Sequence, residues 1–298
     1  MSTSSLEGIF PYLVTPTEPS GKVKENVLAD LVEYLISKGV HGLTPLGSTG
    51  EGAYLPIESR FQVAQVVVDV TASRIPVVAC VNSITTTEAI KEARQMEAIG
   101  VDGIVIVLPT YFPLGQREII AHFRSVAIAV SCPVVLYSNP KFSNWDFTIA
   151  MLRELTQVPN IKYIKDASGN MGKLLTIMNT LDPRIKVFSA SADIPLFVLM
   201  MGGVGWMAGP ACLIPEYCVK LYDLARGKKW EQALRLQKEI WAFNEVFQKY
   251  SLAACVKTGL EIQGFPVGKP LAPQSQLDSS AIREIEELLT KFDTSRVK

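Results

Sequence analysis

The stretch IKYIKDASG, residues 161–169, is a mostly apolar run that ends in polar and small residues. It is one of eight short apolar runs bounded by glycine or proline, and longer segments with helical periodicity separate these runs. Several runs are β-branched and apolar almost throughout, as expected of parallel strands that are covered on both faces. The eight predicted strands span residues 8–14, 42–45, 77–81, 103–108, 134–137, 161–165, 187–189 and 205–208.

Helical segments fill the intervals between these strands, most clearly at residues 25–38, 59–72, 86–98, 117–130 and 173–181. Eight strand–helix repeats of roughly 25 to 30 residues favour a closed (β/α)₈ TIM barrel over an open doubly wound sheet. After about residue 227 only helices follow, at residues 229–250, 252–263 and 279–292. We therefore predict an α/β fold, with a catalytic barrel over residues 1–227 and a C-terminal helical extension over residues 228–298 that packs on the barrel.

The composition argues against several classes of partner. Lysine plus arginine and aspartate plus glutamate both number 29, so no net field recruits nucleic acid. The five cysteines are odd in number and lack CxxC spacing, which indicates reduced thiols in a cytoplasmic protein. We expect no signal peptide, because no basic region followed by an apolar segment occurs at the N-terminus. We expect no membrane span either, because prolines and glycines interrupt the longest apolar stretches, such as residues 194–214. Two histidines without HxH or HExxH spacing indicate no transition-metal site.

Lys165 lies where such barrels place their active sites, at the C-terminal end of a strand. Alternation along the sixth predicted strand puts Lys165 on the same face as Tyr163 and Ile161, which we interpret as the barrel interior. Burial disfavours an ammonium group, so an interior lysine becomes the neutral amine that can attack a carbonyl. The alternative is that the lysine points outward or pairs with a carboxylate such as Asp166.

Other strand ends supply further polar groups. The turn Gly47-Ser48-Thr49-Gly50 offers hydroxyls and backbone N–H groups that suit a carboxylate ligand, although a turn with a simple hydroxyl cap has the same sequence pattern. Tyr137 could transfer a proton near the lysine, but a buried structural tyrosine would look the same. Tyr111 lies in a proline-bounded loop, a position more typical of packing or interface residues.

Taken together, these segments resemble the dihydrodipicolinate synthase and N-acetylneuraminate lyase superfamily of class I, Schiff-base-forming lyases. The resemblance covers essentially the whole chain, and four motifs occur in the right order at the spacing of an eightfold barrel. They are Gly8…Thr15-Pro16, Gly47-Ser48-Thr49-Gly50-Glu51, Leu136-Tyr137-Ser138-Asn139-Pro140 and Ile164-Lys165-Asp166-Ala167-Ser168-Gly169.

The resemblance implies a role for each of these residues. The Lys165 amine condenses with the ketone of pyruvate or a similar 2-oxo acid, whose carboxylate rests on the N–H groups and hydroxyls of Ser48 and Thr49. Tyr137 relays protons, and Thr49 links it towards Tyr111, which comes from a neighbouring subunit in the synthase branch. A homo-oligomer is therefore expected, a dimer or a homotetramer built as a dimer of dimers. This chemistry needs no metal or organic cofactor.

The chain departs from both branches of the superfamily in the residues that hold the second half of the substrate. In the synthase branch an arginine follows the tyrosine motif, whereas this chain reads Lys141-Phe142-Ser143-Asn144-Trp145. A lysine does not reproduce the bidentate geometry of arginine, so we rank dihydrodipicolinate synthesis low. The sialic acid lyase branch has an Asp-Glu pair, a serine and a threonine where this chain has Ala190-Ser191-Ala192-Asp193, Trp206-Met207-Ala208-Gly209 and Ala167. Sialic acid is therefore an unfavourable substrate.

The candidate substrate-binding residues are Gly47, Ser48, Thr49, Ala190, Asp193 and Ala208. Small and apolar residues in the distal pocket favour a smaller or less hydroxylated acceptor aldehyde, or a deoxy sugar acid held chiefly near Lys165. The alternative for Trp206 and Met207 is ordinary packing inside the barrel.

Three functions remain in competition at this point. The leading interpretation is a class I aldolase or lyase that acts on pyruvate or a pyruvate-derived 2-oxo acid. A dehydratase of 2-keto-3-deoxy sugar acids would use the same lysine iminium but expel water instead of an aldehyde. A barrel that kept its ligand site as a binding or regulatory protein is a third interpretation, and the joint presence of Lys165, Tyr137, Thr49 and Tyr111 argues against it.

Overall fold

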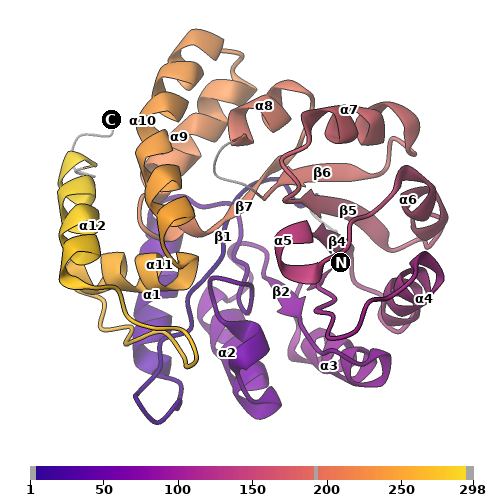
Figure 1. Ribbon diagram of the computed structural model, residues 1–298, viewed down its shortest axis with the longest axis horizontal. Coiled ribbons are helices and arrows are strands. Elements are labelled where there is room, and N and C mark those ends of the chain that lie inside the picture. The colour runs from indigo at the N-terminus through magenta and orange to yellow at the C-terminus, as the bar shows by residue number, and fades with distance from the viewer. Residues whose placement is uncertain (1–4, 191–193, 293–298) are drawn as a thin grey trace.

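The computed structural model describes residues 5–190 and 194–292, and its strands and helices alternate around a central barrel (Figure 1). The strands are β1 (Gly8–Pro11), β2 (Val78–Val81), β3 (Gly103–Ile106), β4 (Val134–Ser138), β5 (Ile161–Asp166), β6 (Lys186–Ser189) and β7 (Gly205–Ala208). The helices are α1 (Glu25–Ser37), α2 (Ile57–Thr71), α3 (Thr86–Ile99), α4 (Gln116–Ala127), α5 (Pro140–Ser143), α6 (Ile149–Leu155), α7 (Met171–Thr180), α8 (Pro195–Met200), α9 (Pro215–Arg226), α10 (Trp230–Lys249), α11 (Leu252–Ile262) and α12 (Ser279–Lys291). Two short 3₁₀ helices span Gly52–Tyr54 and Gly209–Cys212.

The barrel differs from the predicted one at its second strand. Seven strands form a parallel sheet in the order β1-β7-β6-β5-β4-β3-β2, and residues 42–45 form only isolated bridges. This segment still joins the two edges of the sheet, because Leu13 N donates to Thr44 O (3.0 Å) and Val78 N donates to Leu43 O (2.9 Å). Pro45 has no N–H to donate, which limits regular pairing here. The ring is therefore closed at eight positions, as the (β/α)₈ prediction requires.

Helices follow each position of the ring and cover the barrel from outside (Figure 1). The strands β2 and β3, with sequences VACV and GIVI, are buried at every residue, as expected of strands that are packed on both faces. Polar caps fix several helix starts: Thr85 accepts a hydrogen bond from Glu88 N, and Asn170 accepts one from Lys173 N. The loops that follow the strands are thereby held in defined positions at one end of the barrel.

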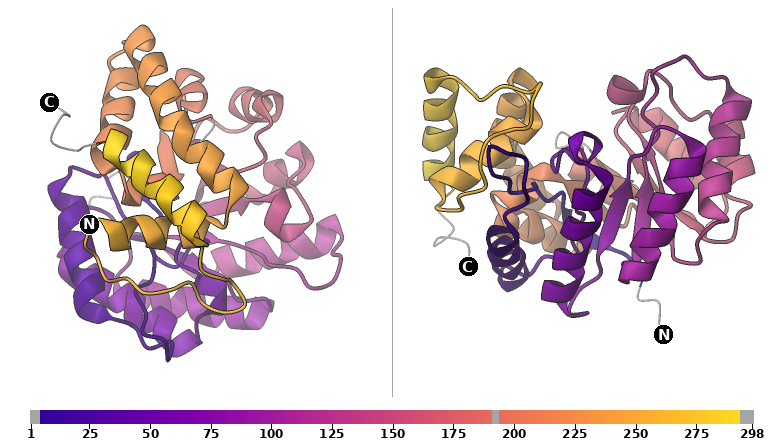
Figure 2. Two further views of the ribbon diagram at one scale, coloured as in Figure 1. Left: turned by 60° about the vertical axis from the view of Figure 1, so that its left-hand side comes forward. Right: turned by 90° about the horizontal axis from the view of Figure 1, so that it is seen from below.

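The C-terminal helices α10, α11 and α12 gather on one side of the barrel (Figure 2). Helix α10 packs against α8 and α9, and α11 packs against the 3₁₀ helix Gly209–Cys212. Gln263 also donates from Nε2 to the carbonyl of Leu213 (2.9 Å). Among the helices of residues 5–190 and 194–292, none is both long and apolar enough to cross a membrane. All five cysteines are free thiols.

Candidate active site

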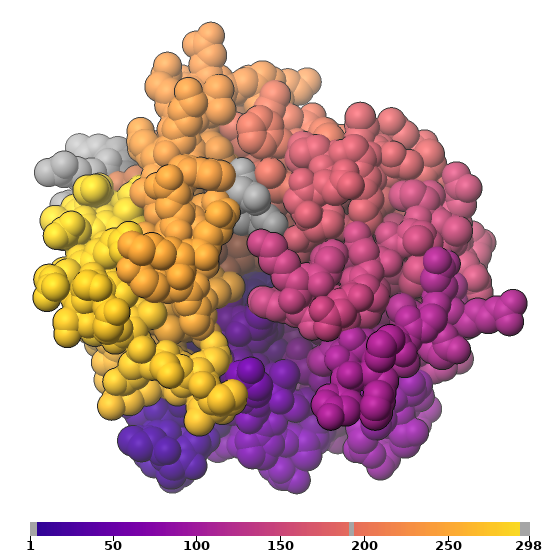
Figure 3. All heavy atoms as spheres, viewed as in Figure 1, coloured from indigo at the N-terminus to yellow at the C-terminus, as the bar shows by residue number. Residues whose placement is uncertain are grey.

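A pocket with a volume of about 580 Å³ opens at the C-terminal ends of the strands. Lys165 from β5, Tyr137 from β4 and Ala208 from β7 line it together with Ser48 and Thr49. Figure 3 shows the corresponding hollow between the C-terminal helices, in orange and yellow, and the segment around α5, in pink. The strand-end rule therefore brings most of the predicted residues into one cavity.

Lys165 is the one basic group at the bottom of this pocket among the described residues, and its side chain is 2% exposed. Its Nζ forms no hydrogen bond or ion pair with any residue that the structure describes. Burial lowers the pKa of Lys165 from 10.5 to about 7, while Cys80 and Asp166 act in the opposite direction. At neutral pH a large fraction of this amine is therefore unprotonated.

The carboxylate next to Lys165 is engaged elsewhere. Asp166 points away from the pocket, and its Oδ2 accepts from Lys173 Nζ at 2.6 Å. Lys173 also contacts Asp146 (2.5 Å), and Asp166 Oδ1 accepts from the backbone N–H of Ser168 (2.9 Å). The alternative in which Lys165 pairs with Asp166 is therefore not the arrangement in the structure.

Tyr137 lies directly against the lysine, in register with it across β4 and β5. Lys165 Nζ is 3.5 Å from the centre of the Tyr137 ring, and the Tyr137 hydroxyl accepts from Asn139 Nδ2 at 3.0 Å. Burial raises the pKa of Tyr137 to about 12, although hydrogen bonds from Asn139 and Ser48 oppose the shift. The phenol is therefore protonated at neutral pH and can donate as well as accept.

Tyr12, just after β1, is a second aromatic neighbour of the lysine that sequence reasoning missed. Its ring centre is 3.9 Å from Lys165 Nζ and 6.4 Å from the ring centre of Tyr137, with an interplanar angle of 72°. Cys80 Sγ lies 3.8 Å from the Tyr12 hydroxyl. Burial raises the pKa of Tyr12 well above its ordinary value, so this phenol is neutral too. The sequence offered no motif for this contact, because Tyr12 lies inside an ordinary predicted strand.

The turn at residues 47–51 places Ser48 and Thr49 in the pocket. Thr15 Oγ1 donates to the carbonyl of Gly50 (2.7 Å), and Glu51 closes the turn in the left-handed region with φ 53°. The backbone N–H groups of Ser48 and Thr49 donate to no described residue, and Thr49 Oγ1 is buried without a partner among the described residues. Two N–H groups and a hydroxyl are thus available for an anionic group of a ligand.

Glu51 connects this turn to the C-terminal helices. Its carboxylate forms a buried ion pair with Lys257 of α11 (2.6 Å) and accepts from Leu271 N (2.6 Å) and Gln274 Nε2 (2.7 Å). Burial lowers the pKa of Lys257, and the neighbouring Glu51 opposes that shift. Lys257 Nζ also donates to the carbonyl of Lys269 (2.9 Å), so the pair is well satisfied.

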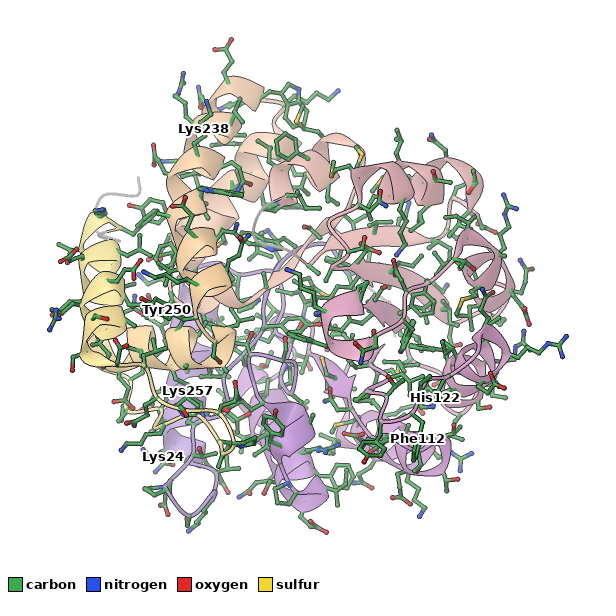
Figure 4. The ribbon with its side chains drawn as sticks, viewed as in Figure 1. Lys24, Phe112, His122, Lys238, Tyr250 and Lys257 are labelled. Atoms are coloured by element: carbon green, nitrogen blue, oxygen red, sulfur yellow. The ribbon has the colours of Figure 1, made fainter. Side chains whose placement is uncertain are left out.

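The far wall of the pocket comes from the C-terminal helices, which sequence reasoning described only as an extension. Figure 4 labels Tyr250 at the end of α10 and Lys257 on α11, and the Tyr250 hydroxyl donates to Glu284 Oε2 of α12 at 2.9 Å. The described residues of this wall are Asn244, Phe247, Gln248, Tyr250, Ser251, Leu252, Ala253 and Gln274. No local motif announces them, because helical periodicity predicts which face is apolar but not which barrel loop that face meets.

The remaining predicted site residues have different positions. Ala190 and Ala208 line the pocket. Gly47 does not line it, and a Cβ there would lie 2.2 Å from the Tyr12 ring, so this glycine is required for packing rather than for ligand contact. Tyr111 is 84% exposed, lies outside the pocket and packs edge-on against Phe112. Asp193 lies outside the described residues.

No group of three or more His, Cys, Asp or Glu residues that could hold a metal ion occurs within the part of the chain that the structure describes. The polar groups that the pocket does offer are the amines of Lys165 and Lys141, phenols, amides, hydroxyls and backbone N–H groups. These groups suit an organic acid with a carbonyl that the amine can attack.

Comparison with known proteins assigns the family. The model of the dihydrodipicolinate synthetase family matches residues 5–292. The chain is 31% identical over 290 residues to the 4-hydroxy-tetrahydrodipicolinate synthase of Methanosphaerula palustris, covering 96% of this chain and 99% of the relative. It is 32% identical over 283 residues to the enzyme of the same name from Bartonella quintana, covering 93% and 96%.

Solved structures give the same result for the fold. Dihydrodipicolinate synthase from Acinetobacter baumannii, crystallised with pyruvate, superposes with a TM-score of 0.92 at 26% identity, covering 96% of this chain and 98% of that one. The synthase from Agrobacterium tumefaciens gives a TM-score of 0.92 at 26% identity, with the same coverage. The matches extend over the barrel and the C-terminal helices alike. The chain therefore belongs to the dihydrodipicolinate synthetase family and is an enzyme of its carbon–carbon or carbon–oxygen lyase type.

Proposed function

We propose that this enzyme is a class I aldolase or lyase that holds pyruvate, or a 2-oxo acid derived from pyruvate, as a Schiff base on Lys165. The observation that supports this most directly is the environment of Lys165, a buried amine without an ion pair, whose pKa burial lowers to about 7. Such an amine is a nucleophile at neutral pH. The related A. baumannii enzyme binds pyruvate in its crystal structure, which supports the same class of ligand here.

The proposed reaction begins when the Lys165 amine adds to the ketone carbon of the substrate. The amine proton moves to the former ketone oxygen, and the resulting carbinolamine takes up one further proton and releases water to form the iminium. We assign these proton transfers to the Tyr137 hydroxyl, because Tyr137 lines the pocket beside the lysine and its ring centre is 3.5 Å from Nζ. The iminium then accepts the electron pair of the C–C or C–H bond that breaks next to it.

Ser48 and Thr49 are the proposed binding site for the substrate carboxylate. Their backbone N–H groups have no acceptor among the described residues, and both residues line the pocket with Lys165. Oriented N–H groups on a turn bind an anion without a second full positive charge. This arrangement would fix the ketone carbon of a 2-oxo acid next to the amine.

The far wall favours an uncharged and hydroxylated acceptor half of the substrate. Among the described lining residues, only Lys141 and Lys165 have acidic or basic side chains, whereas Asn244, Gln248 and Ser251 offer amide and hydroxyl groups. Asn244 is 5% exposed, and its Nδ2 has no partner in the described part of the chain. This wall supports the deoxy sugar acid in preference to the less hydroxylated aldehyde that the small residues of the barrel suggested.

A dehydratase acting on a 2-keto-3-deoxy sugar acid is the second candidate, since the same iminium and the same polar wall would serve it. Product identity separates the two. Release of pyruvate and an aldehyde indicates the aldolase, whereas an undivided acid that is lighter by one water indicates the dehydratase. Dihydrodipicolinate synthesis, the activity in the names of the relatives, ranks lower because Lys141-Phe142 stands where the resemblance expects an arginine nearby.

We also propose that the enzyme is a cytoplasmic homo-oligomer, a dimer or a dimer of dimers. Tyr111 and Phe112 are 84% and 70% exposed and pack against each other at a ring-centre distance of 4.8 Å. Two large aromatic side chains that project together from one loop are typical of a contact surface. A partner chain seated there would bury them.

Reduction with borohydride in the presence of single 2-oxo acids tests the proposal. An iminium on Lys165 becomes a stable secondary amine, so the mass of the intact protein should increase by that of the reduced acid. The same treatment of K165A should add no mass. If no 2-oxo acid adds mass to the wild-type protein, the Schiff-base function is wrong.

A further inference from the structure

The amine of Lys165 lies in the angle between two aromatic rings from different strands. Tyr137 lies 3.5 Å away and Tyr12 lies 3.9 Å away, measured from Nζ to each ring centre, and both distances fall within the range of cation–π contacts. The rings meet edge-to-face, at 6.4 Å between centres and 72° between planes. The nitrogen therefore contacts two electron-rich surfaces at once.

The Tyr12 ring is held firmly in this position. Its backbone N–H donates to the carbonyl of Ala208 (3.1 Å), and the Cys80 thiol approaches its hydroxyl at 3.8 Å. The ring also fills the space in front of Gly47, where any Cβ would overlap it at 2.2 Å. Tyr12 itself is 1% exposed. A ring fixed in this way needs no reorganisation when a positive charge forms beside it.

A positive charge forms at this nitrogen in the iminium intermediate of the proposed reaction. The iminium is the protonated form of the imine, and only this charged form accepts the electron pair of the breaking bond, although burial disfavours it as it disfavours the ammonium. The charged and titratable groups around Nζ are Tyr12 from the end of β1, Cys80 from β2, Tyr137 from β4 and Asp166 on the lysine's own strand. Asp166 is neutralised by Lys173 on the other side of the strand. The phenols and the thiol are uncharged, because burial raises the pKa of each of them.

We infer that the face of the Tyr12 ring, together with that of Tyr137, stabilises the cationic iminium on Lys165 in place of a carboxylate counter-ion. Tyr12 is thus a second aromatic catalytic residue, and its ring rather than its hydroxyl performs the role. This inference rests on the proposed Schiff-base function. It also explains why the hydroxyl of Tyr12 is directed at Cys80 and not at the amine.

Three variants test the inference: Y12L removes the ring, Y12F keeps the ring without the hydroxyl, and F10L is a matched control. Phe10 is a buried aromatic two residues earlier in β1 that packs against Phe188 and lies outside the pocket. Each protein is titrated with pyruvate at several pH values and reduced with borohydride, and the fraction that carries the adduct is measured by intact mass spectrometry. Thermal unfolding of each variant is measured in parallel, and Y12M replaces Y12L if that variant does not fold.

At pH values above the midpoint, where the free amine is neutral, we expect Y12L to need roughly three- to tenfold more pyruvate for half-maximal trapping. Its pH midpoint should fall by up to about one unit, because the ring also stabilises the ammonium. Y12F should restore trapping close to that of the wild type, and F10L should lower stability without moving the midpoint. If Y12L and Y12F trap pyruvate equally well, the ring has no such role. Absence of any adduct in the wild-type protein would instead refute the Schiff-base function itself.

Discussion

At the scale of single residues, the charge state of Lys165 governs the proposed chemistry. Burial in the barrel removes water from the ammonium and lowers the pKa of Lys165 to about 7. No carboxylate in the described structure compensates by pairing with it. The protonated form is therefore the one that burial disfavours, and raising the pH through 7 produces the reactive neutral amine.

The rate of adduct formation with pyruvate should follow this titration. Below about pH 7 the rate should rise about tenfold per pH unit, because the neutral fraction does so, and above pH 7 it should level off. Borohydride is added at fixed times after mixing with pyruvate, and the intact mass of the protein gives the fraction of adduct and hence the rate at each pH. A rate that keeps rising to pH 10 would show that Lys165 titrates like an ordinary surface lysine.

Alternation along one strand was enough to place Lys165, because the pattern of residues 161–165 reflects a local geometric rule. The contact between Tyr12 and Lys165 could not be predicted in the same way. It depends on the absence of a side chain at Gly47, which belongs to another segment, and on the direction of the Tyr12 ring. Contacts of this kind are set by tertiary packing, which residue types in one strand do not encode.

At the scale of elements, α10 supplies polar residues to the far wall of the pocket, and substitution of Asn244 tests whether that wall binds the substrate. N244L keeps the branched shape of the side chain but removes the amide, and loss of one hydrogen bond of about 1 to 1.5 kcal/mol should raise KM for a hydroxylated substrate about five- to tenfold. Trapping of pyruvate alone should not change. Q232L alters an exposed amide on the same helix, outside the pocket, and should leave both quantities unchanged. Equal KM values for N244L and Q232L would exclude Asn244 from substrate binding.

The buried pair between Glu51 and Lys257 connects α11 to the ligand-binding turn. K257M should lower the free energy of unfolding by about 3 to 5 kcal/mol, because it leaves Glu51 buried without its partner. The double variant E51Q/K257M should regain part of that loss. Denaturant unfolding of the single and double variants measures both effects. A loss within about 0.5 kcal/mol for K257M would mean that the pair is exposed in solution.

Elements with strong periodicity were the most predictable from sequence. The predicted helix at residues 25–38 corresponds to α1 at Glu25–Ser37, and residues 279–292 correspond to α12 at Ser279–Lys291. The segment at residues 42–45 has too few residues, and a proline, to form regular ladder bonds, although it occupies a strand position. The division of the chain at residue 227 stays a prediction, since the extension shares the pocket with the barrel.

At the scale of the whole molecule, eight repeats along the chain predicted the barrel because each repeat must place its strand beside the previous one. The wall formed by the C-terminal helices was not predictable, since it depends on where the extension returns to the barrel. The proposed assembly of subunits lies at this scale as well. The proposed contact surface is the loop with Tyr111 and Phe112, which a single chain leaves exposed.

The double variant Y111S/F112S should weaken that assembly. Both side chains are largely exposed, so replacing them should cost the isolated chain little stability, while an interface would lose two aromatic contacts. Light scattering should show a smaller mass for the variant than for the wild type. I128S is the matched control, because Ile128 is 68% exposed at the end of α4. A wild-type protein that is monomeric at all concentrations would contradict the proposed oligomer.

The central claim, that Lys165 forms the Schiff base, is tested most directly by locating the adduct. The protein is reduced with borohydride in pyruvate and digested, and the peptides are sequenced by mass spectrometry. Lys141 also lines the pocket and serves as an internal comparison. We predict the reduced pyruvate group on Lys165 and none on Lys141. Label on Lys141 with Lys165 unmodified, or no label at either lysine, would contradict the claim.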